Sequence, residues 1–510
     1  MQKPILAKGT RDFNSEDLYK RNYIINIIRD NFSKFGFNPI ETPSFERSET
    51  LLGKYGQEGE RLIFKIMQSG LDDYKKSLPP NCLLIPASGY KEVSELTKFL
   101  DDLNIKYVLE GTYEWNGKKF RADLIIDPQG KNIPVEFKQI IDKALRYDLT
   151  VPFARYVVQN QNNINIPFKR YQIQNVWRAD RPQKGRYREF LQCDADVIGS
   201  KSLMQEIDFI SLFDSVFNDL NIEGCVIKIN SRKLLLAICE INNCLDKFGI
   251  LTNQLDKLDK TDANVVKNNL IDNGFDKKII DSLFEIIKLS KNFNDNLEEM
   301  KLYFKSSDIG LEAISDIEYI FNYFSKNKLI KSNLVFDISL ARGIDYYTGV
   351  IFEVLPPKKI NLGSIAGGGR YDNLTEIFGL KNMSGIGISF GLDRLFLVID
   401  ELKLFPTISY NSVKVLLLNF GASFSYDLIE IANFLRLNKV NAEFYPDSIS
   451  LKKQLNYANK NGIPFVLFYG DEEKEKNCYK LKDMKTGNQE TLSREKLVKT
   501  LRENSSETEI

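Results

Sequence analysis

Basic side chains are concentrated in one short stretch of this chain, within residues 169–199. Five basic residues fall within eleven positions, and only Asp180 and Glu189 offset them. The basic residues are Arg178, Arg181, Lys184, Arg186 and Arg188. Guanidinium groups bind phosphate or carboxylate through two parallel hydrogen bonds and stay charged at physiological pH. The stretch could therefore hold an anionic ligand.

Three more polar residues follow the arginines at every second position, namely Gln192, Asp194 and Asp196. On a strand, this spacing points all three side chains to one face. A solvated basic hairpin would explain the arginines alone. A face that also carries carboxylates and an amide makes a poor core, and we expect it to form a pocket for a charged ligand.

The elements that position these residues follow from the alternation of apolar and polar side chains. Tyr171, Ile173 and Val176 alternate before a turn at 182–185, and residues 190–198 alternate after it. This pattern predicts two antiparallel strands joined by a charged loop.

Composition limits the chemistry that this pocket could perform. The chain has 510 residues and no histidine. Zinc sites that use histidine, Ser–His or Cys–His nucleophiles and histidine general bases are therefore excluded. Catalysis must use carboxylates, arginines, tyrosines, a bound metal or the substrate itself.

Length, charge and cysteine usage set the broad class. A chain this long is expected to hold several domains, and its net charge of +1 leaves any nucleic-acid binding to local patches. Its six cysteines form no CxxC pair, which is typical of free thiols in a reducing compartment. We find no apolar leader at the N-terminus and no long apolar run, so we expect a cytoplasmic protein with no membrane contact.

Helical and strand patterns extend over most of the chain. Apolar spacing predicts helices over 15–35, 203–220 and most of 232–328. Residues 36–47 carry Pro39 and Pro43, which exclude a helix and favour an edge or a subunit interface.

Residues 55–144 are harder to assign. Residues 55–65 resemble a loop that runs into a strand. Within 66–144 we expect a small αβ module, with a helix over 91–103 and strands over 106–113, 119–126 and 133–137.

Three later stretches place further polar groups beside apolar strands. Asp148 and Thr150 are expected on one strand face before Pro152 opens a helix. Residues 364–374 hold three consecutive glycines, which either form tight turns or let the backbone approach a ligand closely. Residues 384–400 predict a strand followed by a helix that Gly391 opens.

The C-terminal part is a separate unit by pattern. Strands and helices alternate as βαβαβ over 413–470, followed by a hairpin and a helix. We expect a domain over 412–502 and a frayed tail over 503–510.

Six segments together resemble the histidyl-tRNA synthetase family. The 169–199 stretch, with VWRADRPQKGRYREFLQCDADVIG, is similar to motif 2 of class II aminoacyl-tRNA synthetases, 384–400 to motif 3, and 36–47 to motif 1. LARGIDYYTGVIFEV and AGGGRYDNL resemble the two histidyl signature segments. LRYDLTVPFARY resembles the family's amino-acid-binding strand. The resemblance covers nearly the whole chain except about 66–144, which is longer than the family's core needs.

The resemblance implies an α+β fold. A class II antiparallel-sheet catalytic domain would cover 1–405, with an elaborated segment at 66–144 and a helical insertion at 232–328. A mixed α/β anticodon-binding domain would cover 412–502.

The resemblance also implies a histidine–tRNA ligase that uses ATP and Mg²⁺, without a dedicated protein site for the metal. The implied ATP-binding residues are Arg178, Asp180, Arg186, Phe190 and Arg394. The implied histidine-binding residues are Asp148, Thr150, Gln192, Asp196, Arg342, Tyr346, Tyr347 and Tyr371. Arg342 and Arg178 would be catalytic, and Gln183 would contact the tRNA acceptor end.

The implied partners are L-histidine, ATP, tRNA(His) and a second copy of the chain in a homodimer. Two other functions are compatible with the fold. One is a catalytically inactive relative that regulates histidine biosynthesis, although such relatives lack the anticodon domain and have degraded signature segments. The other is a tRNA-binding sensor with a vestigial site.

Overall fold

The computed structural model describes residues 3–66, 107–115, 118–126, 143–258, 261–290, 293–341, 346–406 and 413–503. The chain divides into two compact units. The first comprises Met1–Arg11 and Ile24–Leu404, and the second comprises Asp12–Tyr23 and Phe405–Ile510. The domain boundaries expected from the sequence stay a prediction, so each unit is described by itself.

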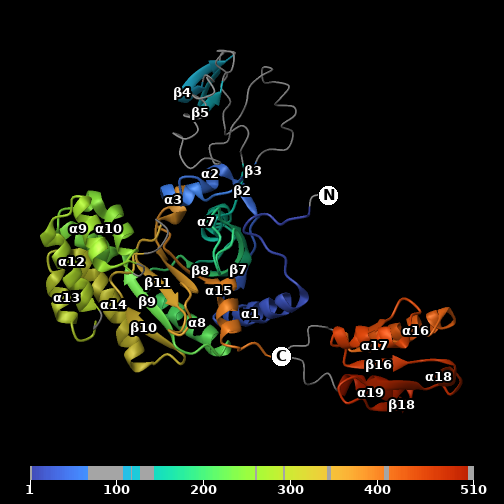
Figure 1. Cartoon of the computed structure of the whole chain (residues 1–510). Helices are drawn as coiled ribbons and strands as arrows, with labels where there is room; N and C mark the ends of the chain where they lie inside the picture. The colour runs from blue at the N-terminus through green and yellow to red at the C-terminus, as the bar shows by residue number, and fades with distance from the viewer. Residues whose placement is uncertain are drawn as a thin grey trace. The chain divides into compact units, whose positions relative to one another are not determined.

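The first unit is built on one large sheet (Figure 1). In spatial order its strands are β1 (Asn38–Pro39), β7 (Phe168–Trp177), β8 (Glu189–Ile198), β13 (Gly385–Gly391), β12 (Ala366–Tyr371), β11 (Val350–Leu355), β9 (Cys225–Ser231) and β10 (Ser332–Phe336). The central pairs are antiparallel, but β1 pairs with β7 and β10 with β9 in parallel. The expected α+β class is confirmed, and the expected antiparallel sheet is mixed at its two edges.

The hairpin expected from the alternation is confirmed as β7 and β8. Cross-strand pairs run from Phe168 opposite Ile198 to Trp177 opposite Glu189. Gly185 lies in the connecting turn with a positive φ of 71°, a conformation that glycine adopts without steric cost.

Helices cover one face of this sheet. They are α1 (Ser15–Lys34), of which Ile24–Lys34 belongs to the first unit, and α8 (Met204–Asp219). Phe213 of α8 packs edge-on against Phe390 of β13, with ring centroids 5.3 Å apart, and Phe32 of α1 lies 6.1 Å from the same ring. Because neighbouring strand residues point to opposite faces, Ser389 is directed to the other side of the sheet.

The helical pattern over 232–328 is confirmed as a group of helices (Figure 1). They are α9 (Arg232–Ile241), α10 (Phe248–Leu255), α11 (Ala263–Asp272), α12 (Lys277–Ser290), α13 (Leu297–Tyr303) and α14 (Asp308–Lys326). Buried apolar residues recur at helical spacing along α14, as in Ala313, Ile317 and Ile320.

Residues 55–66 differ from the expectation. A short helix, α3 (Gly56–Arg61), replaces the expected loop and precedes β3 (Lys65–Ile66), which joins β2 (Phe45–Arg47) and β6 (Lys143–Leu145) in a small sheet. Residues 56–61 are glycine and polar residues and lack the regular apolar spacing of a helix. Contacts with the rest of the fold, rather than local helix propensity, therefore determine that a helix forms there.

A two-stranded hairpin is described within the elaborated segment, with β4 (Tyr107–Trp115) antiparallel to β5 (Lys118–Ile126). This confirms the two strands expected there. The helix expected over 91–103 and the strand over 133–137 lie outside the described residues.

The second unit has a five-stranded sheet in which the expected βαβαβ order is confirmed. Its strands, in spatial order, are β15 (Ala442–Phe444), β14 (Val415–Leu417), β16 (Phe465–Phe468), β17 (Tyr479–Asp483) and β18 (Gln489–Leu492). Its main helices are α16 (Ser425–Leu437), α17 (Leu451–Lys460) and α19 (Arg494–Glu503).

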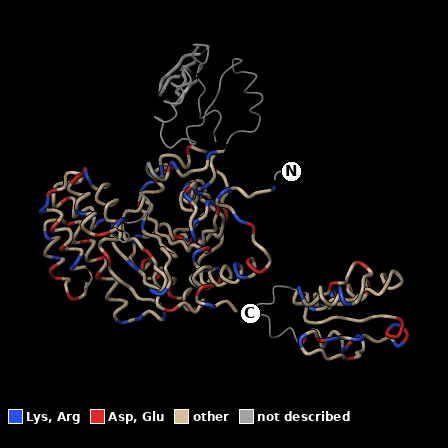
Figure 2. The backbone as a smooth tube through the Cα atoms, viewed as in Figure 1, with Lys and Arg blue, Asp and Glu red and all other residues tan. Residues whose placement is uncertain are grey.

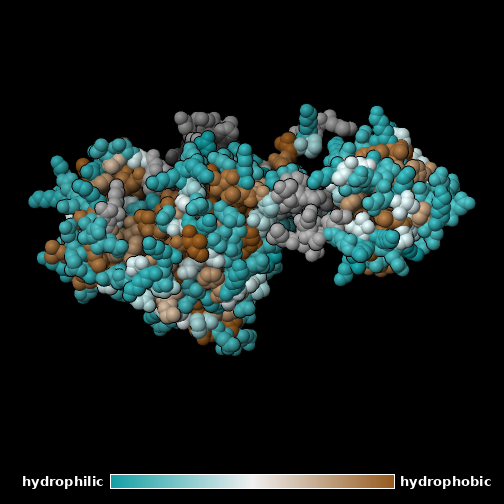
Figure 3. Space-filling view, turned by 90° about the horizontal axis from the view of Figure 1, so that it is seen from below, coloured by the Kyte–Doolittle hydropathy of each residue, from teal (hydrophilic) through white to brown (hydrophobic). Residues whose placement is uncertain are grey.

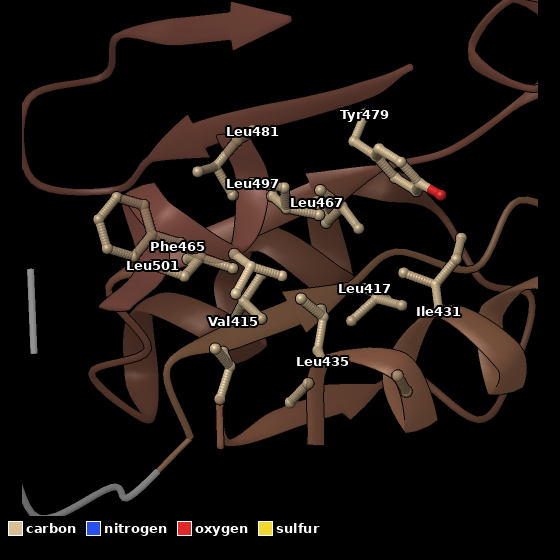
Figure 4. Close-up of a cluster of buried hydrophobic side chains, with 14 of the residues drawn as sticks. Val415, Leu417, Ile431, Leu435, Phe465, Leu467, Tyr479, Leu481, Leu497 and Leu501 are labelled. Atoms are coloured by element: carbon tan, nitrogen blue, oxygen red, sulfur yellow. The ribbon is translucent and has the colours of Figure 1, made fainter. Parts of the chain in front are cut away.

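Both faces of that sheet are covered. Leu417 and Leu467 pack toward α16 and α19 in one cluster (Figure 4), whereas Leu416 and Val466 face Ala458 of α17. Burial on both faces explains why residues 415–418 form a continuous apolar run rather than an alternating pattern.

Basic and acidic residues are interspersed along both units (Figure 2), in keeping with the net charge of +1. On the face shown in Figure 3, hydrophobic residues form scattered patches among hydrophilic ones. Among the described helices, none is long and apolar enough to cross a membrane.

Candidate active site

A large cavity lies on the sheet face that Ser389 points to, and we call it the sheet-face cavity. Its volume is about 1520 Å³. The residues predicted for the site that line it are Asp148, Thr150, Arg178, Asp180, Gln183, Arg186, Phe190, Gln192, Asp196, Tyr346, Tyr347, Tyr371 and Arg394. Arg342 lies outside the described residues. The structure therefore brings together segments that are far apart in the sequence.

Asp148 is a buried acceptor of the cavity, only 2% exposed. The hydroxyl of Tyr55 donates to its Oδ1 at 2.8 Å, and the hydroxyl of Tyr346 donates to its Oδ2 at 3.0 Å. Burial raises the pKa of Asp148, while these hydrogen bonds work in the opposite direction. Burial likewise raises the pKa of both tyrosines, so they stay neutral donors.

The expectation that Asp148 and Thr150 share a strand face is wrong. β6 ends at Leu145, and α7 (Thr150–Gln159) begins at Thr150. The Asp148 carboxylate accepts a hydrogen bond from the backbone N–H of Val151 at 3.2 Å, which satisfies one of the free donors at the helix start. Both residues nevertheless line the cavity.

Asp196 is fixed from two sides. The hydroxyl of Tyr371 donates to its Oδ1 at 2.6 Å, and Nη2 of Arg170 lies 2.8 Å from its Oδ2. The Arg170 contact is an ion pair without good hydrogen-bond alignment, because Oδ2 has no hydrogen-bond partner among the described residues. Burial raises the pKa of Asp196, and the charge of Arg170 opposes that rise.

Gln192 and Tyr347 complete this half of the cavity. Nε2 of Gln192 donates to the hydroxyl of Ser389 at 3.0 Å, and its Oε1 has no partner in the described part of the chain. Burial raises the pKa of Tyr347, and the negative charges of Asp196 and Asp148 raise it further. This half is thus rich in acceptors and suits a ligand that carries positive charge and N–H donors.

Glycines in β13 make room for these side chains. A Cβ atom at Gly387 would overlap the carboxylate of Asp196, and one at Gly385 would overlap the ring of Tyr371. In β12, a Cβ at Gly368 would overlap the backbone carbonyl of Gly387. The glycine triplet therefore permits a close approach between neighbouring strands, and two of its members, Gly367 and Gly368, also line the cavity.

Guanidinium groups line the opposite half. Arg178 lies over two rings, 4.3 Å from the centroid of Tyr147 and 5.3 Å from that of Phe190, and its Nε donates to the Tyr147 carbonyl at 3.0 Å. Arg186 is half exposed and lies 3.6 Å from Asp180. This arrangement holds Arg178 rigidly and leaves Arg186 accessible.

Arg394 approaches the same half from α15 (Leu392–Glu401). Its guanidinium donates to the carbonyls of Ser364 and of Gly185, the latter at 3.3 Å. The neighbouring Asp393 pairs with Arg11 at 2.5 Å, and Arg11 in turn stacks 3.4 Å above the ring of Tyr187. The N-terminal segment thus joins the charged loop to the helix that carries Arg394.

Tyr55, Tyr147 and Arg170 are site residues that the sequence did not reveal. Tyr55 lies 93 positions from Asp148, and no local pattern connects the two. Arg170 could have been found, because extending the expected hairpin places it directly opposite Asp196. A buried carboxylate on one strand and an arginine at its register partner predict an ion pair.

Comparison with known proteins gives consistent results across most of the chain. Residues 142–395 match the family model described as histidyl-tRNA synthetase, and residues 413–504 match the anticodon binding domain. A histidine–tRNA ligase from Flavobacterium johnsoniae is 46% identical over 98% of this chain and 99% of its own length. One from Bacteroides fragilis is 42% identical over 98% of this chain and 99% of its own.

Solved structures share the fold. The histidyl-tRNA synthetase from Nostoc superposes with a TM-score of 0.71 at 23% identity, covering 99% of this chain and 100% of that one. A Bacillus halodurans protein, described as an ATP phosphoribosyltransferase regulatory subunit/histidyl-tRNA synthetase, gives a TM-score of 0.63 at 16% identity, covering 91% of this chain and 99% of that one.

Proposed function

This chain belongs to the histidyl-tRNA synthetase family, and we propose that it acts as a histidine–tRNA ligase in the sheet-face cavity. It activates L-histidine with ATP to histidyl-adenylate and pyrophosphate, and then transfers histidine to the 3′ end of tRNA(His). The observation that carries the assignment is the division of one cavity into a carboxylate-rich half and a guanidinium-lined half. The first suits the amino acid, and the second suits a triphosphate.

In the amino-acid half, Asp148, Thr150 and Gln192 bind the α-ammonium group. The geometry of Asp148 supports its role in binding the ammonium group, because two tyrosine hydroxyls orient its carboxylate. Asp196 and Tyr347 read the two ring nitrogens, with Tyr371 and Tyr346 completing the wall of the pocket. A buried site built to bond both nitrogens rejects a side chain that lacks them, since its own polar groups would be left unpaired.

In the other half, Arg178 binds the α-phosphate, Arg186 the γ-phosphate, and Arg394 clamps the bent triphosphate. Phe190 stacks on adenine. The position of Arg178 over Tyr147 and beside Phe190 supports its role. It places a guanidinium group that could bind phosphate next to an aromatic ring that could stack on adenine.

Mg²⁺ accompanies ATP in this proposal. Among the described residues, no group of three metal-binding side chains is present. Mg²⁺ is commonly held by substrate phosphates, water and one or two carboxylates, and Asp180 is a carboxylate on the cavity wall that fits this pattern. When bound, the ion neutralises phosphate charge.

The chemistry requires no histidine in the protein. The substrate carboxylate is itself the nucleophile, so attack on the α-phosphorus needs alignment and charge stabilisation, which Arg178 and Arg342 provide. In the second step, a ribose hydroxyl of tRNA attacks the aminoacyl carbonyl. A phosphate oxygen of the adenylate accepts its proton, and AMP leaves.

The tRNA is bound by both units. Gln183, which is exposed and lines the cavity, contacts the acceptor end. The domain over 412–502 contacts the anticodon, and the 232–328 helices contact the acceptor stem. Phosphate contacts dominate this affinity, so it falls with increasing salt.

We further propose a homodimer and a cytoplasmic location. The exposed Phe45, beside Pro43 in the motif 1 segment, supports an interface there. The backbone of this segment accepts hydrogen bonds from Arg146 at Thr42 and Pro43, so it lies close to the residues that precede Asp148. The described cysteines are all free thiols, in keeping with a reducing compartment.

The function is tested by histidine-dependent ATP–pyrophosphate exchange with purified protein and Mg-ATP. We expect exchange that requires L-histidine and is not supported by other amino acids. A folded protein without exchange would contradict the ligase assignment and favour a regulatory or tRNA-sensing relative. Transfer of labelled histidine to tRNA(His) then tests the second step.

A first variant tests how Asp148 is oriented. Replacing Tyr55 with phenylalanine removes one donor from a buried carboxylate, and we expect the KM for histidine to rise by about 10–150-fold, since hydrogen bonds to charged groups contribute roughly 1.5–3 kcal/mol. The KM for ATP should stay within twofold. Tyr23→Phe, at a tyrosine outside the cavity lining, is the matched control. An unchanged histidine KM in Tyr55→Phe would remove Tyr55 from the binding site.

A further inference from the structure

Asp194 is a third acidic residue of the amino-acid half, and the proposal above gives it no role. It lies on β8 between Gln192 and Asp196, lines the sheet-face cavity and is only 3% exposed. Its register partner on β13 is Ser389, which hydrogen-bonds to its carboxylate. Its Oδ1 has no hydrogen-bond partner among the residues that the structure describes. A buried carboxylate oxygen without a donor is costly, so a donor from the ligand would complete the site.

The charges around Asp194 leave this half short of positive charge. Arg170, from β7, is 2.8 Å from Asp196 and so offsets that carboxylate first. Arg146 also acts on Asp194, but its guanidinium donates to the carbonyls of Thr42 and Asn175. The other neighbours are negative or neutral, namely Asp148, Asp196, Tyr347 and Ser389. A ligand that brings a positive charge would therefore be favoured.

The protonation of Asp194 is consistent with this surplus of carboxylates. Burial raises the pKa of Asp194 to about 7, and the negative charges of Asp196 and Asp148 contribute to the rise. Arg170 and the hydrogen bond from Ser389 oppose it. At neutral pH, the group can therefore change its charge when a cation arrives.

We propose that Asp194 is a specificity-determining residue that shares with Asp196 the hydrogen bond from one ring N–H of bound histidine and favours the positively charged form of the ring. The inference rests on the proposed function, since it names the chemistry of the same amino-acid pocket. Among the ordinary side chains, only histidine combines a flat ring bearing N–H donors with a pKa near 6.5. With Asp194 and Asp196 on one strand face, the pocket selects a ring that can carry charge against a neutral ring of the same shape.

The test replaces Asp194 with asparagine, which keeps the size of the side chain and removes its charge. Pyrophosphate exchange is measured with L-histidine and with β-(1,2,4-triazol-3-yl)-L-alanine, whose similar ring stays neutral near pH 7. We expect Asp194→Asn to lower kcat/KM for histidine by about tenfold or more, through KM, and to change the value for the triazole analogue much less. The preference for histidine over the analogue should fall by about tenfold, with the KM for ATP unchanged.

A control and a stability measurement separate recognition from folding. The control is Asp316→Asn. Asp316 is a half-buried carboxylate on α14 whose pKa is also raised, to about 6, and it lies outside the cavity lining. This variant should leave the preference for histidine over the triazole analogue unchanged. For Asp194, a folded-state pKa raised above the ordinary value means that its contribution to stability is present at low pH and is lost as pH rises through about 7. At pH 8 without histidine, Asp194→Asn should therefore melt no lower than the wild type.

The outcomes distinguish the two levels of the proposal. An equal loss for both amino acids, or an unchanged preference in Asp194→Asn, would overturn the role of Asp194 while the active wild type keeps the ligase function intact. A folded wild type that shows no histidine-dependent exchange would overturn the proposed function, and this inference with it. A lower preference at an unchanged ATP KM supports the inference.

Discussion

Replacing Arg178 with alanine is expected to lower the rate of histidine-dependent pyrophosphate exchange by about 10²–10³-fold, the range seen when one preorganised donor to a developing charge is removed. Arg178 is held over the ring of Tyr147 and by the Tyr147 carbonyl, so its guanidinium is oriented before ATP binds. The loss should appear mainly in kcat, because charge at the α-phosphorus grows toward the transition state.

The control is Arg29→Ala, which removes an exposed arginine on α1 whose guanidinium donates to Asn26. It should exchange at the wild-type rate. Arg178→Lys keeps the charge without the planar fork and should recover only a small part of the activity. A kcat for Arg178→Ala within threefold of the wild type would contradict the assigned contact with the α-phosphate.

Replacing Asp196 with alanine is expected to reduce the free energy of unfolding of the first unit by about 3–5 kcal/mol and to abolish histidine activation. Breaking a buried pair by removing one partner leaves an uncompensated charge, which is the costly case. Here the remaining charge is Arg170, which is fully buried, and its Nε and Nη1 have no hydrogen-bond partner among the described residues.

A double variant separates the two effects. Adding Arg170→Met to Asp196→Ala removes the stranded charge, so we expect urea unfolding to recover most of the lost stability. Histidine activation should not recover, because the carboxylate that we propose binds the imidazole ring is still absent. If Asp196→Ala unfolds at the wild-type urea concentration, the ion pair contributes nothing and the stability argument fails.

The parts of the fold that follow a local period were predicted well. Alternation predicted β7 and β8, and helical spacing predicted α8 and the helices between 232 and 328. Both signals work because one face of the element is buried and the other is not. The start of α7 was expected at Pro152 rather than at Thr150, because Asp148 and Thr150 alternate as strand residues do. In the structure the Asp148 carboxylate instead accepts a hydrogen bond from the Val151 N–H at the start of the helix.

The part of the cavity lining that could be predicted from residue spacing consists of polar residues at every second position along one strand, β8. Gln192 and Asp196 were predicted to line a pocket, and both line the sheet-face cavity, because several polar side chains on one face of a buried strand would be costly in an apolar core. Tyr55 was not identified, because only the folded chain brings its hydroxyl to Asp148. Residues that orient a binding group come from distant segments, so a single sequence carries no local sign of them.

The glycines of β13 also bear on how this protein could change during evolution. At position 387 no side chain fits while Asp196 keeps its place, and at position 385 none fits while Tyr371 does. A lineage that altered the recognition strand would thus need a matching change on its neighbour, and either change alone would damage the pocket. Gly385 and Gly387 therefore make it harder for single substitutions to change which amino acid the pocket accepts.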